Sequence, residues 1–103
     1  MKPEDLAKQL GRADAPLVVD VRSGFEYRGG HIPGALHMPF WRLPVDCGKL
    51  PDRNRALVLT CEHGPRAQLA LGFLRMRGFS RIELLDGHMH RWRGRKLPLE
   101  KGG

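Results

Sequence analysis

The feature that most constrains the fold is a short apolar run that leads directly into a cysteine, a Gly-Pro pair and an amphipathic segment. Residues 56–59 are apolar, too few for a helix, and suited to a strand buried on both faces. Gly64 permits a tight turn, and Pro65 suits the first position of a helix, where its missing N–H costs nothing. The apolar residues that follow have helical spacing and end before Gly78: Ala67, Ala70, Leu71 and Leu74. The sequence therefore predicts a strand, a loop and a helix in direct succession.

Cys61 begins this loop, and its position suits a nucleophile. The N–H groups of the loop and of the first helical turn are expected to point toward the sulfur, which favours a thiolate and any anion beside it. Arg66 adds a fixed positive charge five positions later. The alternative is an inert cysteine that ends a core strand. The Gly-Pro-Arg sequence that follows favours the nucleophile.

Three motifs resemble the rhodanese-like family of single-domain sulfurtransferases. Residues 61–66 (CEHGPR) look like its active-site loop, residues 20–35 contain its early signature (DVR, Glu26 and GHIPGA), and residues 85–92 contain its late one (LDG and Trp92). The resemblance covers residues of about 4 to 96. It implies that Cys61 carries a persulfide and that the loop stabilises the anionic sulfur through its backbone and Arg66; the loop residues are Glu62, His63, Gly64, Pro65, Arg66 and Ala67.

The reaction implied by this resemblance is sulfur transfer. Cys61 would take sulfane sulfur from a small donor such as thiosulfate or a persulfide, and pass it to a thiophilic acceptor: cyanide in vitro, or a cellular thiol or protein. Neither a metal nor an organic cofactor is implied. Related phosphatases carry seven residues from Cys to Arg, whereas this loop has six. A phosphatase or arsenate reductase is therefore the second hypothesis, and a non-catalytic binding module with a basic carboxyl-terminal face is the third.

Three charged residues near the early signature are expected to support the loop. Asp20 lies near the end of the predicted strand 17–21, at the edge where α/β sheets place their sites. A turn cap and a catalytic carboxylate are both open interpretations of Asp20, and the resemblance implies a supporting role. Arg22 and Glu26 have i and i+4 spacing across a short helix, which predicts an ion pair between them.

The sequence departs from the family pattern at His88, which follows Gly87 where the family usually has a second glycine. If this position needs a positive φ, histidine is sterically costly there. His88 and His90 also raise the possibility of metal binding. No third ligand stands at suitable spacing, so we predict no metal site and interpret both as solvent-facing histidines.

The residues around Cys61 affect the choice of donor. The carboxylate of Glu62 would repel a dianion such as thiosulfate and tend to raise the thiol pKa, which makes a persulfide or protein-bound sulfur a serious alternative donor. His63 either offsets this charge when protonated or faces solvent without a role. We interpret Cys47 as an incidental loop thiol, with resolution of a persulfide or sulfenate on Cys61 as the alternative.

The remaining pattern predicts one α/β domain over residues 1–103. We expect a mainly parallel sheet of four strands, or five with a vestigial one, helices on both faces, and a loose tail over residues 97–103. The net charge of +7 is concentrated in the carboxyl-terminal part, which we interpret as a solvated surface rather than a nucleic-acid site. Without an apolar signal segment or membrane-spanning run, the chain is expected to be a cytoplasmic monomer.

Overall fold

Four parallel strands form the centre of the computed structural model, which describes all residues from 1 to 103. The strands are β1 (Leu17–Asp20), β2 (Leu36–His37), β3 (Leu57–Thr60) and β4 (Ile82–Leu84). The helices are α1 (Pro3–Gln9), α2 (Gly24–Gly29), α3 (Leu43–Asp46), α4 (Pro65–Met76) and α5 (His88–Gly94), with 3₁₀ turns η1 (Phe40–Arg42) and η2 (Cys47–Lys49). The predicted four-stranded parallel sheet is confirmed.

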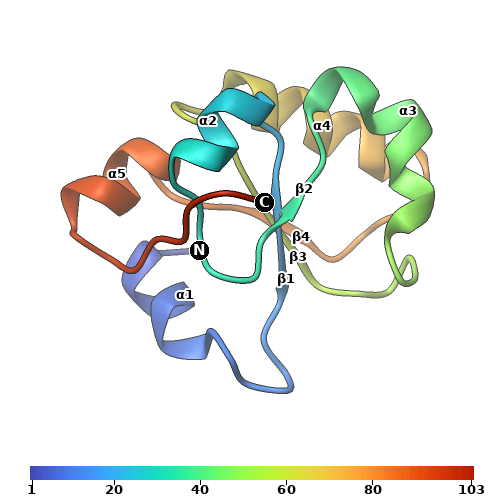
Figure 1. Cartoon of the computed structure of the whole chain (residues 1–103). Coiled ribbons are helices and arrows are strands. Elements are labelled where there is room, and N and C mark those ends of the chain that lie inside the picture. Colours follow the sequence, from blue (N-terminus) through green and yellow to red (C-terminus); the bar gives the residue numbers. More distant parts are fainter.

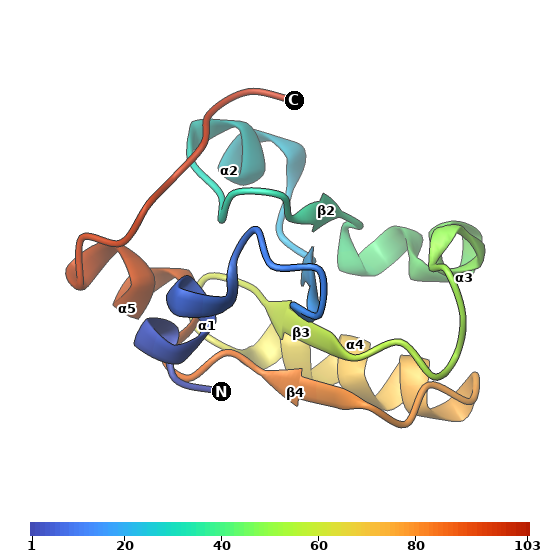
Figure 2. The ribbon, with the colours of Figure 1, turned by 90° about the horizontal axis from the view of Figure 1, so that it is seen from below.

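The strand order is β2-β1-β3-β4, which places β1 and β3 in the middle of the sheet (Figure 2). Asp20 pairs with Thr60 across these two central strands, so both strands end at the same level. Cys61 follows Thr60 directly. The loop that begins at Cys61 therefore leaves the sheet beside the end of β1, at the edge where parallel α/β sheets hold their functional groups.

Helices cover both faces of the sheet, as Figure 1 shows. Helices α3 and α4 pack on one face over a cluster of thirteen buried residues that includes Val19, Leu59 and Leu74. Helices α1 and α5 pack on the other face over a second cluster, to which each contributes a fully buried side chain, Leu6 and Trp92. This double covering explains why the strands read as continuous apolar runs. No helix in the structure is long and apolar enough to span a bilayer.

Helix α4 begins as the sequence predicts. Gly64 is its N-cap with φ of 133°, a conformation that glycine adopts without steric strain, and Pro65 occupies the first helical turn. Ala67, Ala70 and Leu74 face the core, while Gly78, with φ of 94°, follows the end of the helix. The start of α4 is thereby fixed directly beside Cys61.

The carboxyl-terminal residues lie against the turn after α2 instead of forming the loose tail that the sequence predicts. Glu100 and His31 form an antiparallel bridge with two N···O distances of 2.8 Å, and the Gly34 N–H donates to Glu100 Oε1 at 2.9 Å. Trp92 is buried and donates its indole N–H to the Pro98 carbonyl at 2.8 Å. A buried indole N–H needs an acceptor, and the segment after α5 supplies it.

Candidate active site

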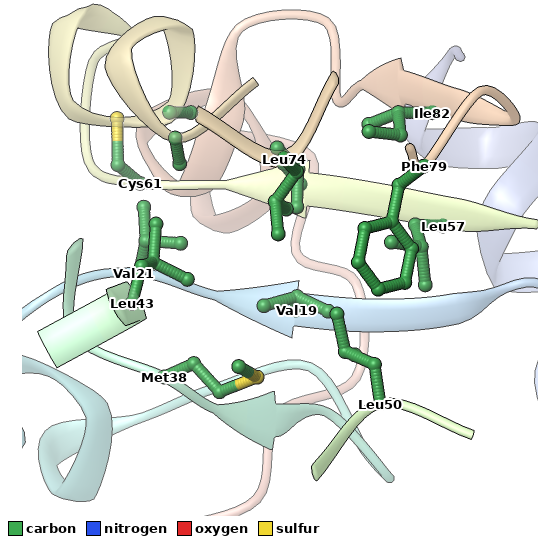
Figure 3. Close-up of a cluster of buried hydrophobic side chains, with 13 residues drawn as sticks. Val19, Val21, Met38, Leu43, Leu50, Leu57, Cys61, Leu74, Phe79 and Ile82 are labelled. Carbon is green, nitrogen blue, oxygen red and sulfur yellow. The ribbon is translucent and has the colours of Figure 1, made fainter. Parts of the chain in front are cut away.

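Cys61 lies at the end of the apolar core beneath its own loop. The residue has no exposed surface, and its sulfur points away from the other labelled side chains of the cluster (Figure 3). The Gly64 N–H donates to Sγ at 2.9 Å. The sequence predicts that N–H groups of the loop and of the first helical turn point toward the sulfur, and in the structure the thiol is also fully buried. The observed sulfur contact comes from a single backbone amide.

The loop backbone is held against the first turn of α5. The Met89 N–H donates to the Cys61 carbonyl at 3.0 Å, and the His90 N–H donates to the Glu62 carbonyl at 3.2 Å. These donors belong to the start of a helix, where N–H groups lack partners within the helix itself. These two hydrogen bonds therefore give partners to free N–H groups of α5 and fix the direction in which the chain leaves β3.

Arg66 closes the loop by pairing with Glu26 from α2. The two guanidinium nitrogens lie 2.7 and 2.9 Å from the two carboxylate oxygens, a bidentate arrangement. Glu26 also completes a capping box with Ser23. The hydrogen bond from Arg66 is the main reason that the pKa of Glu26 falls to about 2, and the carboxylate in turn raises the pKa of Arg66. Arg66 is therefore engaged by a protein carboxylate.

Arg22 does not pair with Glu26, so that prediction is wrong. Helix α2 starts only after Ser23, which leaves Arg22 outside the helix and free to turn back toward β1. Its Nη2 lies 2.8 Å from Asp20 Oδ2, and its Nε lies 3.0 Å from Oδ1. Both side chains are buried, and Asp20 also accepts the Arg22 backbone N–H at 3.0 Å. Asp20 thus serves as a turn cap and the partner of a buried cation.

Two arginines bind the carboxylate of Glu62. Arg93 from α5 pairs with both carboxylate oxygens, and Arg22 Nη1 lies 3.4 Å from Oε1. The hydrogen bond from Arg93 is the main cause of the lowered pKa of Glu62. The sequence pattern assigned Arg93 only to a solvated basic face. Its charge is opposite to that of Glu62, but only the packing of α5 against the loop brings the two side chains together.

His88 is buried, which contradicts the prediction that it faces solvent. Only 6% of the residue is exposed, and burial is the main cause of its lowered pKa. Its φ is 52°, so the position does need the left-handed conformation that glycine adopts easily. The Nδ1 atom accepts the Cys61 backbone N–H at 3.3 Å. Histidine in place of the usual second glycine was the sequence signal that marked residue 88, but it did not reveal the hydrogen bond with Cys61.

The other predicted loop residues divide between the surface and the interior. His63 is exposed and its ring lies 5.1 Å from that of His90, Pro65 is exposed on α4, and Ala67 is buried in the core. Glu62, His63 and His90 place ligand atoms within 4.8 Å of one another. The Glu62 carboxylate of this group is already paired with two arginines. Cys47 is a free, partly buried thiol that packs against the same apolar cluster as Cys61.

A hollow borders the loop, although none lies over the sulfur. Its volume is about 360 Å³, and its lining combines charged and apolar groups: Arg22, Phe25, Glu26, Gly29, Gly30, Glu62, Arg93 and Leu99. Phe25 is 84% exposed. Both members of the Arg93–Glu62 and Arg22–Glu62 ion pairs therefore line a surface depression next to the closed thiol.

A parallel sheet with a cysteine at the end of a central strand, followed by a six-residue Cys-to-Arg loop at the start of a helix, defines a rhodanese-like domain. The family model described as "Rhodanese-like domain" matches residues 2–95. The chain belongs to this family.

Curated relatives carry names that agree with the family. The chain is 31% identical over 96 residues to a sulfurtransferase of Allochromatium vinosum, covering 93% of this chain and 89% of the relative. It is 35% identical over 91 residues to the thiosulfate sulfurtransferase GlpE of Stutzerimonas stutzeri, covering 88% and 82%. Among solved structures, the Alr3790 protein from Anabaena sp. superposes with a TM-score of 0.90 at 25% identity, covering 99% of this chain and 82% of the other. A rhodanese-related protein from Thermoplasma volcanium gives 0.86 at 26% identity, covering 99% and 97%.

Proposed function

We propose that this protein is a sulfurtransferase that carries sulfane sulfur as a persulfide on Cys61. The observation that carries the proposal is the Gly64 N–H directed at Sγ from 2.9 Å, at the junction of a central strand and a helix N-terminus. An amide in this position stabilises negative charge on sulfur. The names of the relatives, sulfurtransferase and thiosulfate sulfurtransferase, support the same reaction.

The reaction consists of two displacements at sulfur. The Cys61 thiolate attacks the outer sulfur of thiosulfate, a new S–S bond forms, and sulfite leaves with the electron pair of the bond that breaks. An acceptor nucleophile then attacks the outer sulfur of the persulfide and releases the thiolate. With cyanide the product is thiocyanate, and with a thiolate it is a new persulfide. No step requires a redox cofactor, because the electrons stay with the sulfur groups that exchange partners.

The pairing of Glu62 bears directly on the donor. A free carboxylate beside Cys61 would repel thiosulfate, whereas this one is neutralised by Arg93 and lies near Arg22. Thiosulfate is therefore a compatible donor, and an organic persulfide is the alternative. A donor must displace part of the loop to reach the sulfur, since Cys61 is fully buried in the structure.

The competing phosphatase or arsenate reductase function has less support. Such an enzyme needs a cation that is free to bind the tetrahedral oxyanion, and here Arg66 is engaged by Glu26. A comparison of thiosulfate cyanolysis with hydrolysis of an aryl phosphate tests this point. Faster phosphate hydrolysis would replace the proposal. Salt-sensitive binding of an acidic partner that survives Cys61→Ser, without any sulfur transfer, would instead indicate a binding module.

Mass spectrometry of the intact protein after incubation with thiosulfate tests the covalent intermediate. We expect a gain of about one sulfur mass that is lost on addition of cyanide, together with thiocyanate formation. Cys61→Ser should abolish both signals, and Cys47→Ser is the matched control that should keep them. Sulfur on Cys47, or no sulfur on either cysteine with any donor, would contradict the proposal.

A further inference from the structure

The buried imidazole of His88 contacts the candidate active-site loop at two points. Its Nδ1 accepts the backbone N–H of Cys61 at 3.3 Å. Its other edge lies against Gly64, because a methyl group built on Gly64 would stand 3.3 Å from Nε2 and 3.4 Å from Cδ2. One ring therefore accepts a hydrogen bond from the residue that carries the sulfur and fills the space beside the residue whose amide points at that sulfur.

The hydrogen bond determines which form of the ring is present. A nitrogen that accepts an N–H bond carries no proton, so the proton of the neutral imidazole resides on Nε2. The buried N–H of Cys61 in turn needs an acceptor. To accept this N–H, the side chain of residue 88 must be short and must carry an acceptor atom two bonds beyond Cβ. Histidine has such an atom, Nδ1.

The backbone shows that this side chain is kept at a steric cost. Gly87 and His88 have φ values of 71° and 52°, a pair of left-handed residues that two glycines would adopt without strain. Gly87 cannot be exchanged, because a Cβ on it would lie 2.5 Å from the Cβ of Arg91. At residue 88 the backbone is strained, and the residue there is a histidine whose side chain reaches the loop.

We propose that His88 is a positioning residue that holds the Cys61 backbone and the Gly64 amide in the arrangement that stabilises charge on Sγ. The proposal rests on the sulfur-transfer function proposed above, with Cys61 as nucleophile. Its consequence is that residue 88 affects the rate of persulfide formation more than the affinity for the donor. The amide must stay in line with the sulfur during the displacement, when the charge moves.

Two substitutions separate the side chain from the backbone strain. Asparagine tolerates the left-handed conformation and places its Oδ1 where His88 has Nδ1, so His88→Asn keeps an acceptor for the Cys61 N–H. His88→Gly relieves the strain but removes both contacts. Arg91→Asn is the matched control, since Arg91 is exposed on the same helix. A stability measurement on each variant distinguishes slow chemistry from partial unfolding.

NMR of ¹⁵N-labelled protein provides a readout that needs no turnover. In the wild type, the proton of His88 should be on Nε2. Amide hydrogen exchange at Cys61 should be roughly 10-fold faster in His88→Gly than in the wild type, and nearly unchanged in His88→Asn. A proton on Nδ1, or equal exchange rates in the glycine variant and the wild type, would overturn the proposal.

Single-turnover persulfide formation is the second readout. His88→Gly should be slower by roughly 10-fold at saturating thiosulfate, with KM changed by less than about 2-fold, while His88→Asn should recover most of the rate. A glycine variant that reacts as fast as the wild type would overturn the positioning role. If the wild type itself forms no persulfide while the NMR results hold, the proposed function fails and the His88 contacts stand as a structural feature.

Discussion

At the carboxyl ends of the strands, charged side chains are buried and paired, whereas the amino ends border the largest hollow on the surface, whose lining contains no cysteine. The hollow has a volume of about 500 Å³ and is lined in part by the residues just before β1, β3 and β4: Pro16, Ala56 and Arg81. The opposite edge holds Cys61 in a closed position. The comparison indicates that in this fold the candidate reactive group lies at the carboxyl ends of the strands, and not at the largest hollow.

The largest expected effect is on stability at the carboxyl edge. Asp20→Asn leaves the buried Arg22 without its main counter-charge, and we expect the free energy of unfolding to fall by about 3 kcal/mol. The matched control is Asp14→Asn, an exposed position that lines the amino-edge hollow, where we expect a change below about 0.5 kcal/mol. Urea denaturation measures both. Equal losses would remove the contrast between the two edges.

Next in size is an effect on the donor. Arg93→Gln removes the main partner of Glu62 and exposes thiosulfate to its negative charge, so we expect the KM for thiosulfate to rise by about 5-fold. Arg95→Gln removes an equal charge from the same end of the chain, but its partner is Glu4 at 2.8 Å. Steady-state cyanolysis should show little change for this control. Equal increases in KM would assign the effect to net charge rather than to Glu62.

A smaller effect should appear in the pH dependence of stability. Because Arg66 lowers the pKa of Glu26 from 4.5 to about 2, the folded state binds this proton less tightly than the unfolded state. The pair therefore stabilises the protein above pH 4.5, and its contribution is lost as the pH falls toward 2. The unfolding free energies of wild type and Glu26→Gln should differ by at most about 1 kcal/mol at pH 6, since the pair is partly exposed. Their difference should shrink on acidification; a constant difference would contradict this account.

The smallest effect is expected at the amino edge. Ser80→Phe places an apolar ring at the large hollow, and we expect sulfur transfer to change by less than about 2-fold. Thiosulfate cyanolysis measures this directly. A large loss of activity, in a variant with normal stability, would show that the amino edge takes part in the function and would break the comparison.

The sequence predicted the elements better than the contacts between them. Apolar runs identify β1 and β3, and Gly64-Pro65 identifies the start of α4, because strand burial and helix initiation depend on local residue types. The partners of Arg22 and Glu26 could not be read in this way. The i, i+4 rule applies only inside a helix, and Arg22 lies before the cap of α2.

The role of α5 illustrates the same limit. His88 and Arg93 look like members of a basic, solvent-facing segment, and only the docking of α5 beside the loop gives one of them a backbone partner and the other a carboxylate. The tail after α5 is similar. Its place at the end of the chain suggests a loose segment, but Glu100 pairs with His31, far away in the sequence, and the Pro98 carbonyl accepts the indole N–H of Trp92 on α5. Long-range pairs of this kind depend on the assembled fold.

The burial of Cys61 has a kinetic consequence. A sulfur without exposed surface can react only during the fraction of time in which its cover has moved aside, so raising the donor concentration cannot accelerate the reaction beyond the opening rate of the loop. Two ion pairs anchored at Glu62 and Arg66, one on either side of Gly64, would then set this ceiling. Breaking these salt bridges would be a step of the proposed reaction that precedes any bond to sulfur.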